Sequence, residues 1–371
     1  MNFDYSEEQI MLQDSITRLL ADSDANAGGE TSWKAFAELG ILGMTFSEAD
    51  GGLDSGPVET MIVMRAIGGG LCAAPFLPSS VYGAEILKAS KADELRSALV
   101  AGLSDGSCQL AVAHAEPGSR FRLAHVGVTA KADGADFILD GRKTLVLGGS
   151  TATHFIVSAR FSGAVGDEAG LALFLVEGAS EGVEVTTRRT IDGRTADIVD
   201  LRSVRVAKTA LLAREDDACQ VLEHATTHAT VACLNEAIGA MEALSALTVE
   251  YLKTRQQFGT TIGSFQALQH KMVDIFVEVE QAKAMALYAV MQLDRPVEER
   301  RDGIGLAKLY VNRAARMVGE TAVQLHGGIG MTMESKAGRL FNRLTACQMT
   351  FGDSEYWLNC LLESEPDILA A

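Results

Sequence analysis

The stretch YLKTRQQFGTTIGSFQALQHKM, residues 251–272, predicts how the C-terminal part of the chain folds. Helical periodicity before it ends near Arg255, and Gly259 and Gly263 mark a turn. A second helix then begins at SFQALQ, with Ser264 as its predicted N-cap. Two helices joined by so short a connection form an αα-hairpin.

The turn also allows a second interpretation. Arg255 and Phe258 flank the turn, so a guanidinium and an aromatic ring are available at one place. A guanidinium binds phosphate well, and a ring can stack on a planar ligand. A structural hairpin and a ligand contact both fit these residue types.

Two further C-terminal stretches place glycines beside polar residues. In QLHGGIGMT, residues 324–332, the adjacent Gly327 and Gly328 allow a close backbone approach, and their N–H groups can face a pyrophosphate. A helix C-cap needs only one glycine. In QMTFGDSEYWL, residues 348–358, Gly352 breaks a helical segment, which indicates either a turn or an approach to a bound group.

The hydrophobic period changes twice along the chain, which predicts three domains in an α+β architecture. Residues 1–108 favour an N-terminal helical domain, and residues 213–371 favour a C-terminal four-helix bundle. Between them, residues 109–212 contain short β-like runs broken by Gly and Asp, typical of a β-sandwich or barrel. The seven runs are QLAVAHAE, HVGVTAK, DFILDG, TLVLGG, THFIVSAR, LALFLVEG and ADIVDLRSVRV.

Composition restricts the class of protein. The formal net charge of −17 argues against general nucleic-acid binding, which needs a basic face. The six cysteines form no C-x-x-C pair, and no apolar run reaches the length of a membrane span. The acidic, amphipathic start MNFDYSEEQIMLQDS is unlike a signal peptide. A cytoplasmic location is therefore expected.

Several familiar site patterns are absent from the sequence. No G-x-G-x-x-G, P-loop or Gly-x-Ser-x-Gly motif occurs, so Rossmann, Walker and serine-hydrolase sites are not indicated. His224 and His228 are four residues apart, but their segment offers no evident third metal ligand. We expect no metal site.

In order and spacing, six stretches resemble the acyl-CoA dehydrogenase family over essentially the whole chain. Short, heteromer-type members such as the small subunit of pimeloyl-CoA dehydrogenase are the most similar in appearance. The stretches are SEADGGLDSGPVETMIVMRAIG, AHAEPGS, LDGRKTLVLGG, TRQQFGTTIGSFQALQHKM, QLHGGIGMTME and TFGDSEYWL.

The resemblance implies FAD as cofactor, acyl-CoA as substrate and an electron-transfer flavoprotein as electron acceptor. It also implies a tetramer built as a dimer of dimers. Residues 116–119 and 145–148 match segments that face the flavin ring. The positions that match cofactor-binding residues of the family are Arg255, Gln257, Phe258 and Gln266 for a neighbouring subunit's flavin, Gln324, Gly327 and Gly328 for its diphosphate, Asp353 and Glu355 for the adenosine half, and Leu147 and Ser119 near the ring.

The family's two positions for the catalytic glutamate are not acidic here. Phe351 precedes the glycine of the last motif, and Ala229 occupies the alternative position on the helix before the arginine motif. The nearest substitutes by sequence are Glu236, His228 and Glu355, and each is displaced along or around its helix.

The resulting hypothesis is a FAD-dependent acyl-CoA dehydrogenase that forms a 2,3-enoyl-CoA. It would act in fatty acid, steroid or dicarboxylate catabolism, with a homologous larger subunit that supplies the base. Two alternatives remain. One is a catalytically incomplete structural or regulatory subunit of such a complex, and the other is an unrelated helical binding protein.

Overall fold

The computed structural model describes residues 4–22, 29–90, 93–214, 216–332 and 334–364 of the 371-residue chain. These residues divide into two compact units. One unit lies within residues 1–27, 57–73 and 230–371, and the other lies within residues 28–56 and 74–229. The boundary between them falls inside the long helix α6, Asp216–Thr254.

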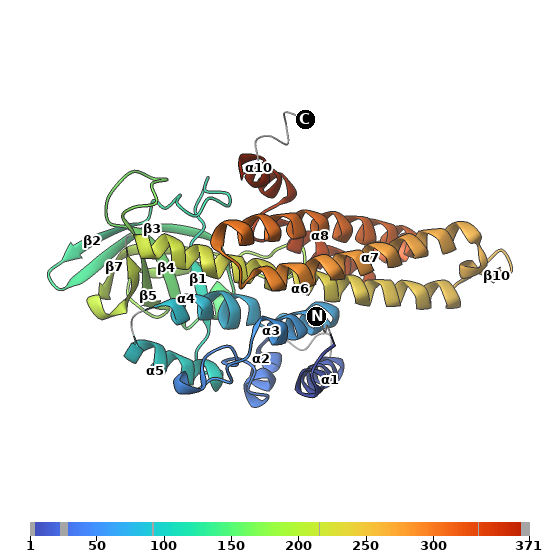
Figure 1. Cartoon of the computed structure of the whole chain (residues 1–371), viewed down its shortest axis with the longest axis horizontal. Coiled ribbons are helices and arrows are strands. Elements are labelled where there is room, and N and C mark those ends of the chain that lie inside the picture. The colour runs from blue at the N-terminus through green and yellow to red at the C-terminus, as the bar shows by residue number, and fades with distance from the viewer. Residues whose placement is uncertain (1–3, 23–28, 91–92, 215, 333, 365–371) are drawn as a thin grey trace. The chain divides into compact units, whose positions relative to one another are not determined.

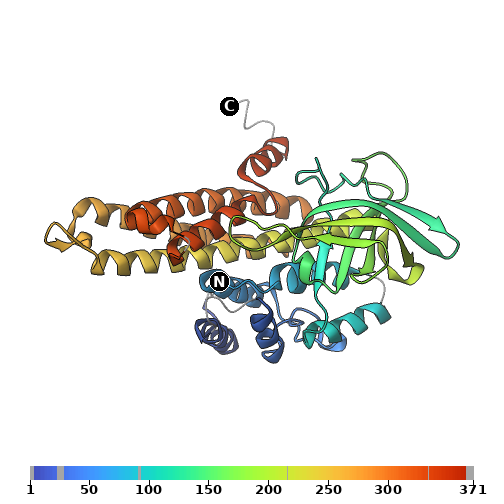
Figure 2. The same ribbon diagram turned by 180° about the vertical axis from the view of Figure 1, so that it is seen from behind.

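The first unit is helical. Its elements are α1 (Glu7–Asp22), α3 (Pro57–Gly70), the C-terminal part of α6, α7 (Gln266–Gln292), α8 (Val297–His326), α9 (Lys336–Met349) and α10 (Ser354–Ser364). The long helices α6, α7 and α8 run side by side, and the label β10 marks the tip of the α6–α7 hairpin (Figure 1). α9 packs on α8 and is the short orange-red helix in front of the bundle when the molecule is seen from behind (Figure 2).

The α6–α7 connection is the predicted hairpin, with a correction at its second helix. β9 (Gln256–Gln257) pairs with β10 (Thr260–Thr261) between the two helices. The N-cap of α7 is Phe265, and the Ser264 hydroxyl donates to the carbonyl oxygen of Thr261 at 2.7 Å. Ser264 is therefore not the N-cap, because a short 3₁₀ turn separates β10 from α7.

Local signals at the N-terminus are confirmed. Ser6 and Gln9 form the predicted capping box, with the Ser6 N–H donating to Gln9 Oε1 at 3.0 Å and the Gln9 N–H donating to Ser6 Oγ at 3.2 Å. α3 begins at Pro57, as expected for proline at the first helical position.

Two glycines allow α3 and α6 to cross closely. A Cβ added at Gly68 would lie 1.9 Å from the carbonyl oxygen of Glu236, and one added at Gly239 would lie 1.9 Å from that of Arg65. No other residue fits at either position without a shift of the backbone.

The second unit contains the β domain. Its helices are α2 (Gly29–Glu38), α4 (Ala84–Ala89), α5 (Asp93–Ser104) and the start of α6, and a π-helical segment, Leu77–Gly83, leads into α4. The sheet has the order β6-β7-β3-β2-β4-β5-β8, with β1 paired to β4. Its strands are β1 (Leu110–Ala113), β2 (Thr129–Asp133), β3 (Asp136–Leu147), β4 (His154–Arg160), β5 (Leu171–Glu177), β6 (Val183–Thr186), β7 (Ala196–Ala207) and β8 (Leu211–Arg214).

The strands differ from the seven predicted runs in two respects. DFILDG and TLVLGG are one bulged strand, β3, in which Gly141 has φ +144° beside a register shift against β7. The short strands β6 and β8 were not predicted, because four residues give too little alternation to recognise. The core between the strands is apolar and includes Phe155, Phe174 and Val199.

Candidate functional site

The loop of residues 116–119 follows β1 and is closed by its own serine. Ser119 Oγ donates to the carbonyl oxygen of Glu116 at 2.8 Å and accepts from the Glu116 N–H at 3.1 Å. The Ser119 side chain is buried. Its hydroxyl therefore stabilises the loop.

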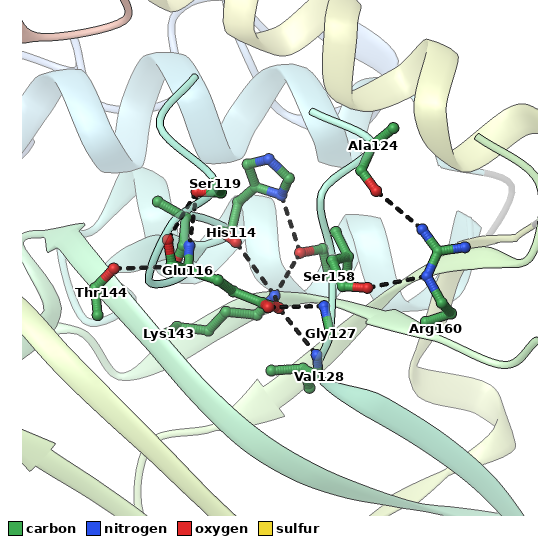
Figure 3. Close-up of polar contacts among 12 residues, drawn as sticks. His114, Glu116, Ser119, Ala124, Gly127, Val128, Lys143, Thr144, Ser158 and Arg160 are labelled. Carbon is green, nitrogen blue, oxygen red and sulfur yellow. Dashed lines mark hydrogen bonds and ion pairs between the residues drawn. The ribbon is translucent and has the colours of Figure 1, made fainter. Parts of the chain in front are cut away.

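A buried lysine holds this loop on the sheet. Lys143 Nζ lies 2.6 Å from Oε1 of Glu116, and it also donates to the His114 carbonyl at 3.2 Å and to Ser158 Oγ at 2.9 Å (Figure 3). The Lys143 side chain has no exposed surface. Burial lowers the pKa of Lys143 to about 8, against the opposing effect of the Glu116 carboxylate.

The same network includes the ring of His114. Ser158 Oγ, which accepts from the Lys143 ammonium, lies 3.0 Å from His114 Nδ1. Burial, with the nearby Lys143 charge, lowers the pKa of His114 to about 3.

The second β segment, residues 145–148, consists of the last three residues of β3 and Gly148. The Thr144 N–H donates to the Ala115 carbonyl at 2.7 Å, which joins this segment to the first loop. The β3–β7 register shifts again between Lys143 and Val146, and Leu145 has φ +53° with its side chain 66% exposed. Bulges of this kind redirect side chains and often lie beside active sites. Leu147, in contrast, is half-buried.

The hairpin tip presents the predicted arginine-motif residues. Phe258 and Gly259 have φ +56° and +82°, which is the pattern of a type I′ turn, and the Phe258 side chain is 92% exposed. Arg255, Gln257 and Gln266 are all exposed around it. The structure therefore brings these four predicted residues together on one surface.

The double-glycine motif lies at the C-terminus of α8. Gln324 is exposed, and Gly327 has φ +62° with its N–H bonded to the Gln324 carbonyl. A Cβ added at Gly327 or at Gly328 would meet no atom within 4 Å. The backbone at both glycines is open, as the approach of an anionic group requires.

His326 connects this motif to the hairpin. Its ring stacks on Tyr251 with centroids 4.4 Å apart, and His326 Nε2 lies 3.2 Å from Thr248 Oγ1. Tyr251 precedes Arg255 by about one helical turn on α6. The double glycine and the arginine motif therefore lie at the same end of the bundle.

The turn before α10 is rigid. Phe351 and Gly352 have φ +56° and +111°, and Trp357 Nε1 donates to the Phe351 carbonyl at 3.0 Å. A Cβ on Gly352 would clash with the Trp357 indole nitrogen. Asp353 Oδ1 accepts from the Tyr356 N–H at 2.8 Å, which caps α10, and Glu355 is exposed in its first turn.

Three of the predicted segments contain a non-glycine residue with a strained backbone. Seven non-glycine residues among those described have positive φ, and Leu145, Phe258 and Phe351 belong to three different predicted segments. Each such conformation costs about 1–2 kcal/mol for a residue with a Cβ. Strain of this kind clusters at active sites and ligand contacts.

The two positions expected for a catalytic base lack an acid, and the nearby Glu236 is engaged in an ion pair. Ala229 is fully buried. Glu236 accepts from Arg343 Nε at 2.9 Å and from Arg343 Nη2 at 2.6 Å, so both carboxylate oxygens are bound in the interior. His228 Nδ1 lies 3.7 Å from a carboxylate oxygen of Glu85.

Two polar clusters were not predicted from the sequence. The Lys143–Glu116 pair could have been suspected from a lysine at an inward position of a β-like run. The grouping of Glu85 with His224 and His228 joins residues 139 or more positions apart, and no local pattern indicates it. It supplies the third ligand that the sequence around the histidines lacks.

Comparison with known proteins agrees with the resemblance. Three domain models of the acyl-CoA dehydrogenases match the chain: the N-terminal domain at residues 6–107, the middle domain at residues 111–202 and the C-terminal domain at residues 219–364. The chain therefore belongs to the acyl-CoA dehydrogenase family. Its helical, β and helical order confirms the predicted fold class.

Individual relatives are distant but extend over most of the chain. A 3-(aryl)acrylate reductase of Clostridium sporogenes is 26% identical over 87% of this chain and 86% of its own length. The mitochondrial long-chain specific acyl-CoA dehydrogenase of Sus scrofa is 26% identical over 91% of this chain and 81% of its own length. The ChsE4-ChsE5 complex from Mycobacterium tuberculosis has the same fold, with a TM-score of 0.85 and 24% identity over 100% of both chains.

Family membership makes the chain a flavoprotein oxidoreductase with FAD as its cofactor. The open glycine backbones at Gly327 and Gly328 and the exposed ring of Phe258 fit such a group. Among the helices of the described residues, none has the length and apolarity needed to cross a membrane.

Proposed function

We propose that this chain is one subunit of a heteromeric, FAD-dependent acyl-CoA dehydrogenase in which a homologous subunit supplies the catalytic carboxylate. In this reaction a carboxylate removes the α-proton of the acyl-CoA, and FAD, when bound, would supply the acceptor for the β-hydride, which leaves a 2,3-enoyl-CoA. The observation that carries the proposal is the absence of an acid at both base positions, Phe351 and Ala229.

The neighbouring acid cannot easily replace the missing base. General-base catalysis needs a basic atom within hydrogen-bond reach of the proton. Glu236 is fully buried and both its oxygens are paired with Arg343. Moving Glu236 toward a substrate would leave the buried Arg343 uncompensated, which costs about 3–5 kcal/mol.

The remaining site residues are assigned by the family resemblance, and the exposure of Gln324, Glu355 and the residues of the hairpin tip supports it, whereas Ser119 is buried. We assign the diphosphate to the open backbone of Gly327 and Gly328 with Gln324, and a neighbouring subunit's flavin to the hairpin tip. The assigned residues are Arg255, Gln257, Phe258 and Gln266 at the tip, Asp353 and Glu355 for the adenosine half, and Leu147 and Ser119 beside the ring. The domain boundaries we propose are 1–108, 109–212 and 213–371, which the three matched ranges support.

An exposed apolar face supports assembly with another subunit. On α7, the side chains of Val273, Phe276 and Val277 are 57%, 60% and 43% exposed, and their i, i+3, i+4 spacing places them on one face. Apolar patches of this kind are usually covered in an assembly. The ChsE4-ChsE5 structure is by its name a complex of two different chains.

We propose a dimer of dimers with an electron-transfer flavoprotein as electron acceptor.

Native mass spectrometry of the co-expressed proteins tests this proposal. The chain would be produced with each homologue from the same organism that keeps a glutamate before the glycine of the last motif. We expect a mixed complex with fewer FAD molecules than chains. A homotetramer of this chain alone with one FAD per chain, formed even when the homologue is present, would contradict the proposal.

The alternative of a structural or regulatory subunit makes a different prediction. In that case the partner would bind its full complement of FAD and oxidise acyl-CoA without this chain. We expect instead that the partner alone loses FAD, and that Arg255→Ala in this chain reproduces the loss while the complex still assembles.

A further inference from the structure

Three side chains of the metal-binding types converge in the second unit. His224 and His228 are four residues apart on α6 and so share one face of the helix, while Glu85 comes from α4. His224 Nε2 lies 3.2 Å from Glu85 Oε2, and His228 Nδ1 lies 3.7 Å from Glu85 Oε1. One ligand atom from each residue lies within 4.8 Å of the other two.

The carboxylate at the centre of this cluster is buried. Glu85 is 4% exposed, whereas the His224 and His228 side chains are 37% and 17% exposed. A buried carboxylate is costly unless positive charge compensates it. Lys88 Nζ, 2.6 Å from Glu85 Oε1, gives part of that compensation, and its side chain is 31% exposed and able to turn outward.

A pocket adjoins the cluster along the α4 and α6 helices. It has a volume of about 360 Å³, and its lining includes Gln220, Val221 and Ala89. Gln220 is one helical turn before His224, and Ala89 is one turn after Glu85. The pocket therefore lies about one helical turn from the cluster along each helix.

We propose that Glu85, His224 and His228 bind one divalent transition-metal ion of the zinc class, with the fourth coordination position directed to this pocket. Two imidazoles and one carboxylate are the donor set of open, three-ligand zinc sites. Imidazole ligands favour zinc, cobalt, nickel and copper over magnesium and calcium. The ion replaces the Lys88 ammonium as the positive charge beside Glu85. His228 directly precedes the base position Ala229 on α6, but binding of an ion by these three side chains does not depend on the proposed function.

Titration of the FAD-loaded protein with Co²⁺ tests the site. We expect one equivalent to bind with the visible absorption of a four-coordinate ion and without a thiolate charge-transfer band, which separates this site from the six cysteines. Zn²⁺ should displace Co²⁺ and raise the unfolding temperature. Glu85→Gln and His224→Ala should each weaken binding by more than about 100-fold, beyond the loss typical of outer-shell changes. His270→Ala, which removes an exposed histidine elsewhere, is the matched control.

A second measurement needs no variant. Bound Zn²⁺ must protect His224 and His228 of the wild-type protein from diethyl pyrocarbonate, as read by peptide mass spectrometry. Absence of binding to the wild-type protein at micromolar metal, a thiolate band, or equal modification of both histidines with and without Zn²⁺ would each overturn the proposal. Full binding by a folded Glu85→Gln variant would do the same.

Discussion

At the scale of single residues, the hairpin tip combines an unfavourable backbone conformation with a side chain that is almost fully exposed. Phe258 has a left-handed backbone conformation, is 92% exposed, and its ring meets that of Phe265 edge to face at a centroid distance of 6.2 Å. Asparagine tolerates this conformation far better than phenylalanine. A bound ligand or neighbouring subunit would explain why the phenylalanine is kept.

We therefore expect Phe258→Asn to lower FAD retention about tenfold, or about 1.4 kcal/mol, while changing the free energy of unfolding by less than about 1 kcal/mol. The backbone strain that this substitution relieves is similar in size to the ring stacking on Phe265 that it removes. FAD affinity would be measured by flavin fluorescence and stability by urea unfolding. Ser203→Asn is the control, because Ser203 has φ +52° on β7, far along the chain from the proposed contacts. Equal FAD affinity in wild type and Phe258→Asn would contradict the assignment.

The buried histidine of the β domain predicts a pH dependence of stability. The pKa of His114 is lowered from 6.5 to about 3 in the folded chain, so the unfolded chain binds one more proton between these values. The free energy of unfolding therefore decreases as the pH falls from 6.5 toward 3, by up to about 1.4 kcal/mol per pH unit from this group.

His114→Gln should flatten that part of the curve while keeping a hydrogen-bonding side chain beside Ser158. Urea unfolding at a series of pH values measures the effect, and His270→Gln serves as the exposed control. If His114→Gln and the control have the same slope between pH 6.5 and 3, the buried neutral histidine is not the cause.

At the scale of elements, the crossing of α3 and α6 depends on two glycines. Gly239→Ala would place a methyl group 1.9 Å from the Arg65 carbonyl, and the backbone would have to move. We expect a loss of about 3 kcal/mol in the free energy of unfolding. Gly69→Ala is the matched comparison, because its Cβ would lie 3.3 Å from the nearest atom and helix propensity favours alanine. Gly69→Ala should change the free energy of unfolding by less than about 1 kcal/mol. Similar losses in both variants would show that the close crossing at Gly239 does not determine the stability of the helix pair.

Elements with a strong local signal were predictable from the sequence. The helical hairpin, the capping box at Ser6 and the start of α3 at Pro57 each depend on residues within a few positions of one another. The short strands β6 and β8 could not be predicted in this way, and the N-cap of α7 was predicted one residue too early.

The candidate site likewise has parts that the sequence could predict and parts that it could not. The glycine and arginine motifs are contiguous and could be identified, whereas the ion pair of Lys143 with Glu116 spans 27 positions and the Glu85–His224 contact spans 139. Such pairs depend on the packing of whole elements, which no local pattern encodes.

At the scale of the whole molecule, the chain belongs to the acyl-CoA dehydrogenase family but has no acid at either of the two positions that the resemblance implies for the base. A substitution can test whether the carboxylate is the missing part. Phe351→Glu places one at the family position, and Phe351→Gln is the isosteric control. In the isolated, FAD-loaded chain we expect Phe351→Glu to reduce flavin at least about 100-fold faster than Phe351→Gln, since a positioned general base contributes about 10²–10⁴-fold. Equal rates would mean that the position is not a functional base site here.

The most direct test of the missing carboxylate is anaerobic stopped-flow reduction of FAD in the purified wild-type chain, mixed with acyl-CoAs that the mixed complex oxidises. We expect the absorbance of oxidised flavin to persist with the chain alone and to be bleached once the homologous subunit is present. Bleaching by the chain alone at an ordinary enzymatic rate, roughly 1–10³ s⁻¹, would contradict it.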